Sequence, residues 1–345
     1  MRAEEVHSAI SELHEKCISS HFDRNDENLP IMYHYTSSKA ALSIIKNLQL
    51  RLTDIRFVND PLEITKAVSI GHPIVCEELK KLNENTSAHR ALLITWHYFL
   101  NAIRQYIEPR IIIDFEERLT VLSESLRIRI IKGARLREPR VFMAAFSSSE
   151  DDLTQWRAYA NQGKGYNIGF DFRNSPFLQQ TQYSYGFNKS FCGIVKTNYA
   201  SDEKKAHYFS DWLGQLISFL NENSETSFFS SEDITDIDAH LIVSLMHCLL
   251  YDVIACKNDH YKSENEWRIF QVVSSDANTP AEDGFYLKNN IFIPYKILSL
   301  KNEINSVKTG PANLSPLTQI GIEYLLKSKG IQNYLIDASE IKYRG

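Results

Sequence analysis

The stretch Tyr33-His34-Tyr35-Thr36-Ser37-Ser38 joins a predicted strand to a predicted helix and carries a histidine near the junction. Tyrosine, threonine and isoleucine favour a pleated surface, so residues 31–36 are expected to form a strand. Side chains alternate along a strand, which places His34 and Thr36 on the same face. Either serine can cap the helix that follows. His34 and Thr36 are therefore expected to lie side by side at a strand-to-helix turn.

The bulk composition is that of a soluble protein. The chain has 345 residues, of which 43% are hydrophobic and 23% are charged, enough for one large domain or two ordinary ones. A formal net charge of -5 gives no global reason to bind nucleic acid or an anionic membrane. The beginning of the chain lacks the apolar run of a signal peptide, and residues 91–107, taken as the most apolar stretch, are interrupted by polar side chains. We expect a cytoplasmic protein with no membrane partner, whose five cysteines are reduced.

Hydrophobic periodicity predicts a mixed fold. Core strands are expected near residues 31–53, 140–197 and 264–345, with helical insertions near residues 72–137 and 200–256. Strands that come in runs, without regular alternation with helices, predict an α+β fold. Residues 1–345 show no internal repeat and are expected to form a single domain.

A second candidate segment follows the strand predicted at residues 140–146. Its serines, Ser147 among them, are expected to cap a helix that begins at Glu150. Trp156 and Tyr159 lie three residues apart on that helix and so share a face. A buried aromatic pair explains this spacing and is favoured for Trp156. Tyr159 is the better candidate for a site, because its hydroxyl needs a polar partner even where the ring is covered.

The third candidate segment begins a late strand. With a period of two, Lys262, Glu264, Glu266 and Arg268 line one face and Trp267 the other. One interpretation is a solvated ladder of alternating charge, which contributes little to stability. The other is that this row of charges leads down into a cleft, since the same face continues into apolar residues.

The segment Asn59-Asp60-Pro61-Leu62-Glu63 also has two interpretations. Asp60 as N-cap, Pro61 at the first helical position and Glu63 at the third resemble a capping box. Alternatively, Asn59, Asp60 and Glu63 line the same cleft as His34.

A histidine on an early strand, a serine and an aromatic residue at a strand-to-helix turn, and a late Glu-x-Glu resemble the ADP-ribosyltransferase fold. More closely, the chain is similar to the bacterial domain-of-unknown-function family twenty-nine seventy-one. The likeness covers nearly the whole chain and rests on the stretches at residues 33–36, 57–63, 146–147, 156–170, 264–268 and 339–344. It implies a split β-sheet core with large helical insertions.

The resemblance implies cleavage of the nicotinamide–ribose bond of NAD, with NAD as the substrate and no metal. Cleavage builds oxocarbenium-like charge on the ribose, which a carboxylate aimed at that position stabilises. Glu266 takes this role by resemblance. Glu264 orients or deprotonates the acceptor as a general base, and His34 hydrogen-bonds a ribose hydroxyl.

The remaining implied roles concern binding of NAD. Thr36 or Ser147 steadies the nicotinamide or the ribose, and Trp156 belongs to the same binding surface. Tyr159 stacks on the cationic nicotinamide ring with a gain of about 1 kcal/mol. Arg268 holds a phosphate, because its guanidinium is a fixed fork of donors.

One residue departs from the resemblance, and three functions stay open. Tyr35 stands where the polymerases of this fold have glycine, so the site is narrower or the tyrosine packs behind the strand. The leading expectation is an NAD-dependent ADP-ribosyltransferase or NAD glycohydrolase. It would act as a bacterial toxin or antiphage effector on an unknown protein or nucleic-acid acceptor, with a cognate antitoxin or defence-system partner. The alternatives are a non-catalytic nucleotide-binding module, and a metal-dependent nuclease that uses Asp60, Glu63, Lys262, Glu264 and Glu266.

Overall fold

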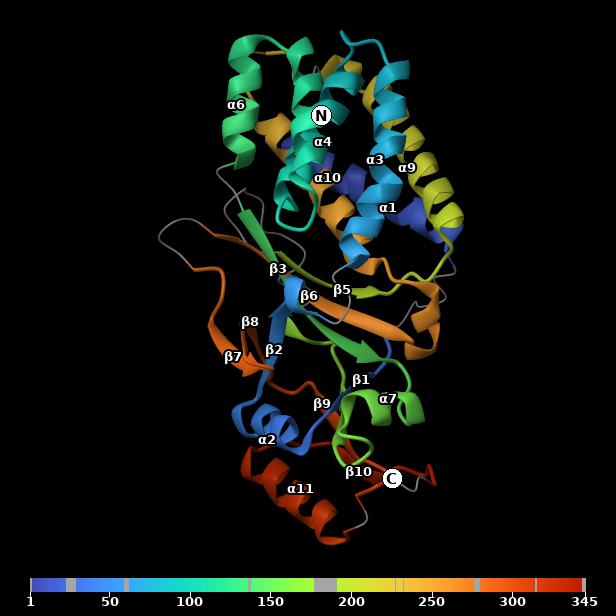
Figure 1. Ribbon diagram of the computed structural model, residues 1–345, viewed down its shortest axis with the longest axis vertical. Coiled ribbons are helices and arrows are strands. Elements are labelled where there is room, and N and C mark those ends of the chain that lie inside the picture. The colour runs from blue at the N-terminus through green and yellow to red at the C-terminus, as the bar shows by residue number, and fades with distance from the viewer. Residues whose placement is uncertain are drawn as a thin grey trace.

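The computed structural model describes residues 2–22, 29–58, 62–135, 138–176, 191–226, 228–231, 233–275, 280–313 and 315–342. Helices gather in a layer at the top of Figure 1, and a twisted sheet with further helices fills the lower part. The fold is therefore α+β, as the arrangement of strands and helices in the sequence predicts.

One mostly antiparallel sheet holds ten strands in the described residues. They are β1 (Met32–Thr36), β2 (Gln49–Asp54), β3 (Glu138–Ser147), β4 (Tyr166–Phe170), β5 (Phe191–Lys196), β6 (Glu266–Ser275), β7 (Gly284–Lys288), β8 (Ile291–Ser299), β9 (Ile304–Thr309) and β10 (Leu335–Ala338). The main order is β10-β9-β4-β1-β3-β2-β8-β7, and β6 pairs with both β3 and β5. Only the pairing of β10 with β9 is parallel among these strands.

The strand register brings three distant segments together. Tyr33 of β1 pairs with Ser147 of β3, and Ser147 pairs in turn with Glu266 of β6. His34 therefore lies one residue along its strand from the row that contains Glu266. This register positions the candidate site.

The helices form two groups. The upper layer contains α1 (Ala3–His21), α3 (Leu62–Lys81), α4 (Ser87–Ala102), α5 (Pro109–Glu116), α6 (Glu124–Arg135), α9 (Asp202–Glu222) and α10 (Asp236–Ala255). The lower part contains α2 (Ser38–Asn47), α7 (Leu153–Tyr159) and α11 (Leu317–Ser328). Four 3-10 turns complete the described elements: η1 (Ile55–Phe57), η2 (Glu117–Val121), η3 (Ser224–Thr226) and η4 (Asp259–Glu264).

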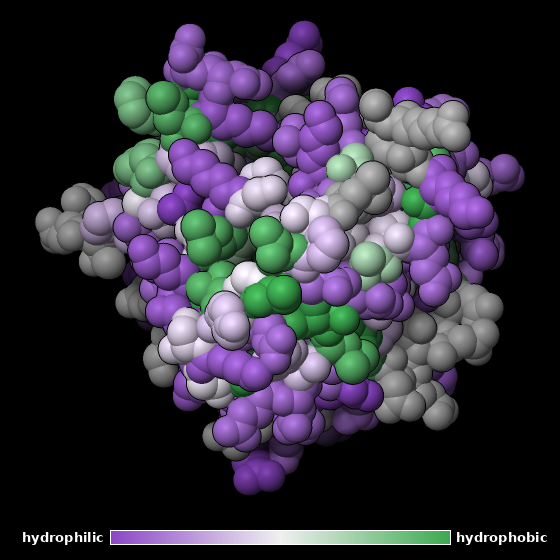
Figure 2. Space-filling view, turned by 90° about the horizontal axis from the view of Figure 1, so that it is seen from below, coloured by the Kyte–Doolittle hydropathy of each residue, from purple (hydrophilic) through white to green (hydrophobic). Residues whose placement is uncertain are grey.

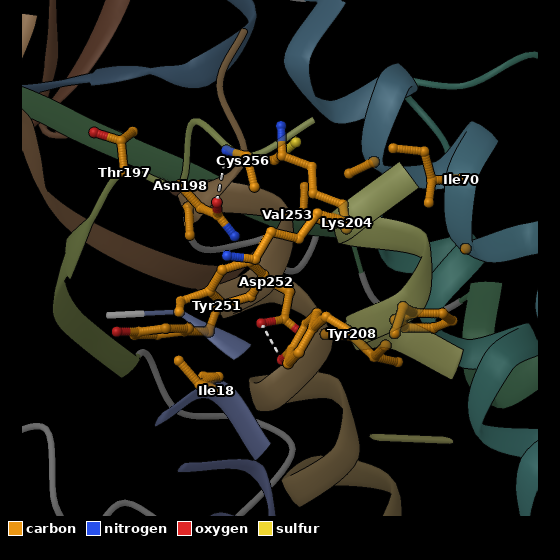
Figure 3. A pocket seen from close by; sticks show the side chains of 18 of the residues that line it. Ile18, Ile70, Thr197, Asn198, Lys204, Tyr208, Tyr251, Asp252, Val253 and Cys256 are labelled. Carbon is orange, nitrogen blue, oxygen red and sulfur yellow. Dashed lines mark hydrogen bonds between the residues drawn. The ribbon is translucent and has the colours of Figure 1, made fainter. Parts of the chain in front are cut away.

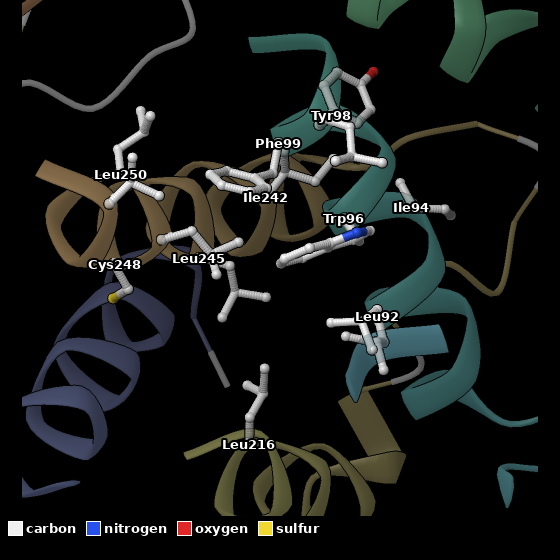
Figure 4. Close-up of a cluster of buried hydrophobic side chains, with 14 of the residues drawn as sticks. Leu92, Ile94, Trp96, Tyr98, Phe99, Leu216, Ile242, Leu245, Cys248 and Leu250 are labelled. Carbon is white, nitrogen blue, oxygen red and sulfur yellow. The ribbon is translucent and has the colours of Figure 1, made fainter. Parts of the chain in front are cut away.

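Each part of the molecule has its own hydrophobic core. Side chains of α4, α9 and α10 meet in the upper layer, where Trp96 lies against Phe99 with ring centroids 4.9 Å apart (Figure 4). The lower core lies between the sheet and the helices α2 and α11, and it includes Phe146, Phe170 and Phe172. Seen from below, apolar residues also gather near the middle of the lower face (Figure 2).

The apolar stretch at residues 91–107 is not the one that most resembles a membrane span. Among the described residues, α10 is the one helix that is long and apolar enough to cross a bilayer by length and composition. However, 56% of its apolar window is buried inside the protein. Burial of this kind is typical of the core helix of a soluble protein.

Several local predictions can be compared with the structure. The side chain of Ser37 accepts a hydrogen bond from the amide of Ala40 and so caps α2, as expected. The prediction of a serine cap for α7 is wrong, because the Asp152 carboxylate accepts from the amides at positions 154 and 155. A carboxylate is an equally good cap and also interacts favourably with the helix dipole. Asn59, Asp60 and Pro61 lie outside the described residues, as does the side chain of Glu63.

Candidate active-site cleft

A cleft of about 290 Å³ opens where β1, β3 and β6 lie side by side. Of the residues predicted for the site, it is lined by His34, Ser147, Tyr159, Glu264, Glu266 and Arg268. Its size lies near the lower end of the roughly 300–1,000 Å³ range of small-molecule sites. The cleft thus brings together most of the predicted residues, from these strands and from the elements beside them.

Two carboxylates and two cations form a tightly paired cluster in the cleft. Glu266 is buried; one of its oxygens accepts a bond of 2.7 Å from Nε of Arg268, and the other pairs with Nζ of Lys257. Lys257 also contacts Oε2 of Glu264 at 2.6 Å. The interpretation of this row as a solvated charge ladder is therefore wrong, because Glu266 and Arg268 are 4% and 2% exposed.

The charges of the cluster set the pKa values of Glu266 and Lys257. Burial opposes ionisation of Glu266, but Arg268 and Lys257 outweigh burial and hold the pKa of that carboxyl below its usual value. Burial likewise favours neutral Lys257, and the two carboxylates overcome it and raise the pKa of the amine. Glu266 is thus an anion and Lys257 a cation at neutral pH.

Glu264 lies on a different element from the one predicted. Residues 259–264 form η4 and Asn265 adopts a left-handed conformation with φ 45°, so the strand begins only at Glu266. Glu264 therefore enters the cleft from a turn that precedes the strand. Lys262, which the strand pattern placed on the same face, instead lines a neighbouring cavity.

Tyr159 and Ser147 both contact Glu264. The Tyr159 hydroxyl donates to Oε1 of Glu264 over 3.0 Å, and its ring stays 39% exposed. Burial, followed by the negative charge of Glu264, raises the pKa of Tyr159 to about 12, so the hydroxyl keeps its proton. Ser147 is buried, and its Oγ donates to the main-chain oxygen of Glu264 at 2.7 Å. Ser147 thus fixes the turn, and Tyr159 presents a ring to the cleft.

His34 lies on β1, where it is half-buried and lines the cleft. Its Nδ1 lies 3.1 Å from the carbonyl oxygen of Ala145, which can only accept, so Nδ1 carries the proton. Burial lowers the pKa of His34, and the bond to Ala145 opposes that shift without cancelling it. The neutral ring keeps a lone pair on Nε2, which can accept a hydrogen bond from a ligand hydroxyl.

Three predicted binding roles do not fit the structure. Trp156 is fully buried, its Nε1 donates to Asp151 at 2.6 Å, and its ring lies edge-on to Tyr35 at 4.8 Å. It is a core residue, and the ring of Tyr35 packs against it, although Tyr35 also lines the cleft. Thr36 is buried and is absent from the described lining of the cleft. Arg268 lines the cleft, but its guanidinium already binds Glu266 and the carbonyl oxygen of Ile254, at 2.6 Å, and so is not free for a phosphate.

The sequence patterns missed Lys257, the residue at the centre of the cluster. It follows Cys256, the C-cap residue of α10, where no motif or periodicity marks it. The cleft also contains Arg51, which lies over the ring of Tyr295 at 4.7 Å. A lysine just beyond a long helix, nine residues before the second glutamate, was the only available signal.

The main chain of Glu266 is held by residues 197–199. Tyr199 accepts a hydrogen bond of 2.8 Å from the Glu266 amide, and Thr197 donates its hydroxyl to the Glu266 carbonyl. Asn198 accepts a bond of 3.2 Å from the amide of Lys257. These three residues also line a second cavity of about 400 Å³, between β5 and the helical layer. Figure 3 shows this cavity, with Asp252 bound to the Tyr208 hydroxyl. One short segment therefore separates the cleft from the larger cavity.

Comparison with known proteins yields one family. Residues 155–269 match the model of a family described as "Protein of unknown function (DUF2971)", which confirms the family expected from the sequence over that third of the chain. No curated protein and no solved structure matches the chain. The matched segment includes Tyr159, Lys257, Glu264 and Glu266, whereas His34 lies before it.

Proposed function

We propose that the cleft cleaves the nicotinamide–ribose bond of NAD, either transferring ADP-ribose to an acceptor or hydrolysing the dinucleotide. The observation that supports this proposal is the convergence of His34, Tyr159, Glu264 and Glu266 on one cleft. They come from β1, α7, η4 and β6. With a cleft of about 290 Å³, the nicotinamide and its ribose occupy the cleft and the rest of the dinucleotide lies outside.

The surroundings of each of these four residues suit it to one role in the reaction. The exposed ring of Tyr159 stacks on the cationic nicotinamide, and Nε2 of His34 accepts a bond from a ribose hydroxyl. Glu266 is held as an anion, so it can oppose the positive charge that develops on the ribose as the bond breaks. Glu264, whose carboxylate is less enclosed, is placed to take a proton from the attacking hydroxyl or water.

Lys257 is a positioning residue in this scheme. It bridges the two carboxylates in the absence of substrate and holds them at a common point. The arriving nicotinamide is itself a cation, so it competes with Lys257 for Glu264. The ammonium therefore stays on Glu266 or moves aside when substrate binds.

The test uses purified protein, NAD and chromatographic measurement of free nicotinamide. We expect Glu266→Gln to lower the rate about 10²–10³-fold, the range for removal of one electrostatic group that acts in the transition state. Glu303→Gln is the matched control, because Glu303 is equally buried but binds Ser175, away from the cleft. Equal nicotinamide release by wild type and Glu266→Gln, with both folded by circular dichroism, would refute the proposal.

A specific observation favours one second candidate, a non-catalytic module that binds ADP-ribose or a related nucleotide. All four carboxylate oxygens of Glu264 and Glu266 already have partners among Tyr159, Lys257 and Arg268. Carboxylates neutralised in this way stabilise a cationic transition state less strongly. Calorimetry that detects ADP-ribose binding in the absence of nicotinamide release would support this module. The nuclease is less favoured, because Lys257 occupies the position between the carboxylates where a metal would bind.

The biological setting proposed for this activity is a bacterial toxin or antiphage effector in the cytoplasm. The acceptor would be a protein or a nucleic acid, and a cognate antitoxin or defence-system partner would restrain the activity. Expression of wild type and of Glu266→Gln in bacteria tests this setting. Growth arrest is expected with wild type only.

A further inference from the structure

Two helices of the upper layer present metal-ligating side chains at one place. Cys17 and His21 lie one turn apart on α1, and His207 and Asp211 lie one turn apart on α9. Residues four apart share a helix face, and α1 packs directly on α9. We propose that Cys17, His21 and Asp211 form a binding site for a divalent transition-metal ion of the zinc class, independent of the cleft.

The distances between ligand atoms suit a tetrahedral ion. Sγ of Cys17 lies 3.6 Å from Oδ2 of Asp211, and Nε2 of His21 lies 3.7 Å from the same oxygen. With metal distances of about 2.3 Å to sulfur and about 2.0–2.2 Å to nitrogen and oxygen, tetrahedral ligand atoms lie about 3.3–3.6 Å apart. All three ligand atoms lie within 4.8 Å of one another, so a modest movement of the side chains places them around one ion.

Neighbouring groups already orient these side chains. Nδ1 of His21 lies 3.1 Å from the Cys17 carbonyl oxygen, which can only accept, so Nδ1 carries the proton and Nε2 keeps a lone pair. Gln215 donates a bond of 3.0 Å to Asp211. Metal-binding histidines and carboxylates typically have such partners, which fix the tautomer and the ring orientation.

The arrangement also leaves two acceptors facing each other. An unprotonated Nε2 and a carboxylate oxygen repel unless a cation lies between them. A metal ion bound between them removes that repulsion. The thiol of Cys17 donates to the same Asp211 oxygen over 3.6 Å, and a metal bound there would replace the thiol proton, because the thiolate is the form that binds a metal.

A candidate fourth ligand and a route to solvent both lie beside the three ligands. The ring centroid of His207 lies 5.4 Å from that of His21, so a change of rotamer brings it to the ion. A surface hollow lined by His207, Asp211 and Gly214 opens beside the site. The mixed sulfur, nitrogen and oxygen donors select zinc and its neighbours over calcium or magnesium.

The experiment titrates Co²⁺, a coloured substitute for zinc, into reduced protein that carries no histidine tag. We expect one equivalent to bind with visible bands of tetrahedral cobalt and a thiolate-to-cobalt charge-transfer band. Zinc should displace the cobalt and abolish these bands. Cys17→Ser should lose the charge-transfer band, and Asp211→Asn or His21→Gln should weaken binding about ten-fold or more, since even supporting residues cost that much.

Cys76→Ser is the matched control, because Cys76 also lies one turn from a histidine, His72, at 3.6 Å, but among the described residues no third ligand joins that pair. It should bind cobalt like wild type. Absence of tetrahedral bands in wild type, or a charge-transfer band that persists in Cys17→Ser, would overturn the proposal. His21→Gln decides the matter if Cys17→Ser fails to fold, because its side chain is partly exposed. None of these readouts depends on NAD.

Discussion

Replacing Lys257 by methionine tests whether the charged cluster of the cleft stabilises the fold. The substitution keeps most of the side-chain volume but removes the ammonium that contacts both Glu264 and Glu266. Removing one member of a buried ion pair costs about 3–5 kcal/mol, because the partner is left buried and uncompensated. Here Glu266 keeps Arg268 and Glu264 keeps the Tyr159 hydroxyl. We therefore expect the free energy of unfolding to fall by about 2–4 kcal/mol.

The assay is urea denaturation followed by circular dichroism, over a range of pH. In wild type the lowered pKa of Glu266 adds stability that is present above the pKa of an unfolded carboxyl and is lost as pH falls through the folded pKa. Without Lys257 the folded pKa of Glu266 lies closer to that of an unfolded carboxyl, so the acid-induced loss of stability is smaller and ends at a higher pH. The double variant Lys257→Met/Glu266→Gln also lacks the buried negative charge, so its total cost should be less than the sum of the two single costs.

Lys327→Met provides the control, because Lys327 forms an exposed pair with Glu323 on α11. Such pairs contribute about 0.5 kcal/mol or less. If Lys257→Met cost no more than this control, the cluster would behave as a surface ion pair and the reasoning from burial would be refuted.

Two further predictions concern residues outside the cluster. Gly165→Ala should destabilise the protein by about 2 kcal/mol or more, because its Cβ would lie 2.2 Å from a main-chain oxygen of β1. A Cβ added at Gly321 would meet open space, so Gly321→Ala should instead stabilise α11 by up to about 1 kcal/mol. Thermal unfolding of the two glycine variants tests both expectations. For His14, burial lowers the pKa but the charge of Asp252 outweighs it and raises the pKa well above the usual value. The stability that protonated His14 gains from Asp252 is present below the unfolded pKa and is lost as pH rises through the folded pKa. Asp252→Asn should therefore lower the melting temperature most at pH 5–6 and less at high pH. A difference in melting temperature that grew with pH would contradict the pairing.

The sequence predicted most elements of the sheet because their signals are local. Alternation and β-branched residues identified the strands near residues 140–146, 266–273 and 291–299, and all three are present. The prediction for Thr36 failed for a reason that alternation cannot supply. Thr36 is two residues from His34 and so points to the same face of β1, but it lies at the end of the strand opposite Tyr166, beyond the cleft. Alternation predicts the face to which a side chain points, whereas its position relative to the cleft depends on how the strand pairs with its neighbours.

The Glu-x-Glu pair shows the opposite case, in which the prediction reached the right place for the wrong reason. Alternation placed Glu264 and Glu266 on one face of a strand, yet Glu264 belongs to a 3-10 turn and Asn265 adopts a left-handed conformation that interrupts the alternation. What brings the two carboxylates together is Lys257, which binds both. A cation that comes from a different element leaves no periodic trace in the sequence, so it was missed.

The assembly of the cleft explains why no single motif was decisive. Tyr33 lies opposite Ser147, and Ser147 lies opposite Glu266, so three segments far apart in the chain occupy adjacent strands. A histidine on a strand is usually structural when considered alone, and a glutamate at the start of a strand is usually solvated. Because β3 separates β1 from β6, the two side chains meet only if all three strands pair in this register. A one-residue slip of β3 would turn Ser147 to the other face and remove the support of Glu264. The register of β3 is therefore the physical basis for treating His34 and Glu266 as parts of one site.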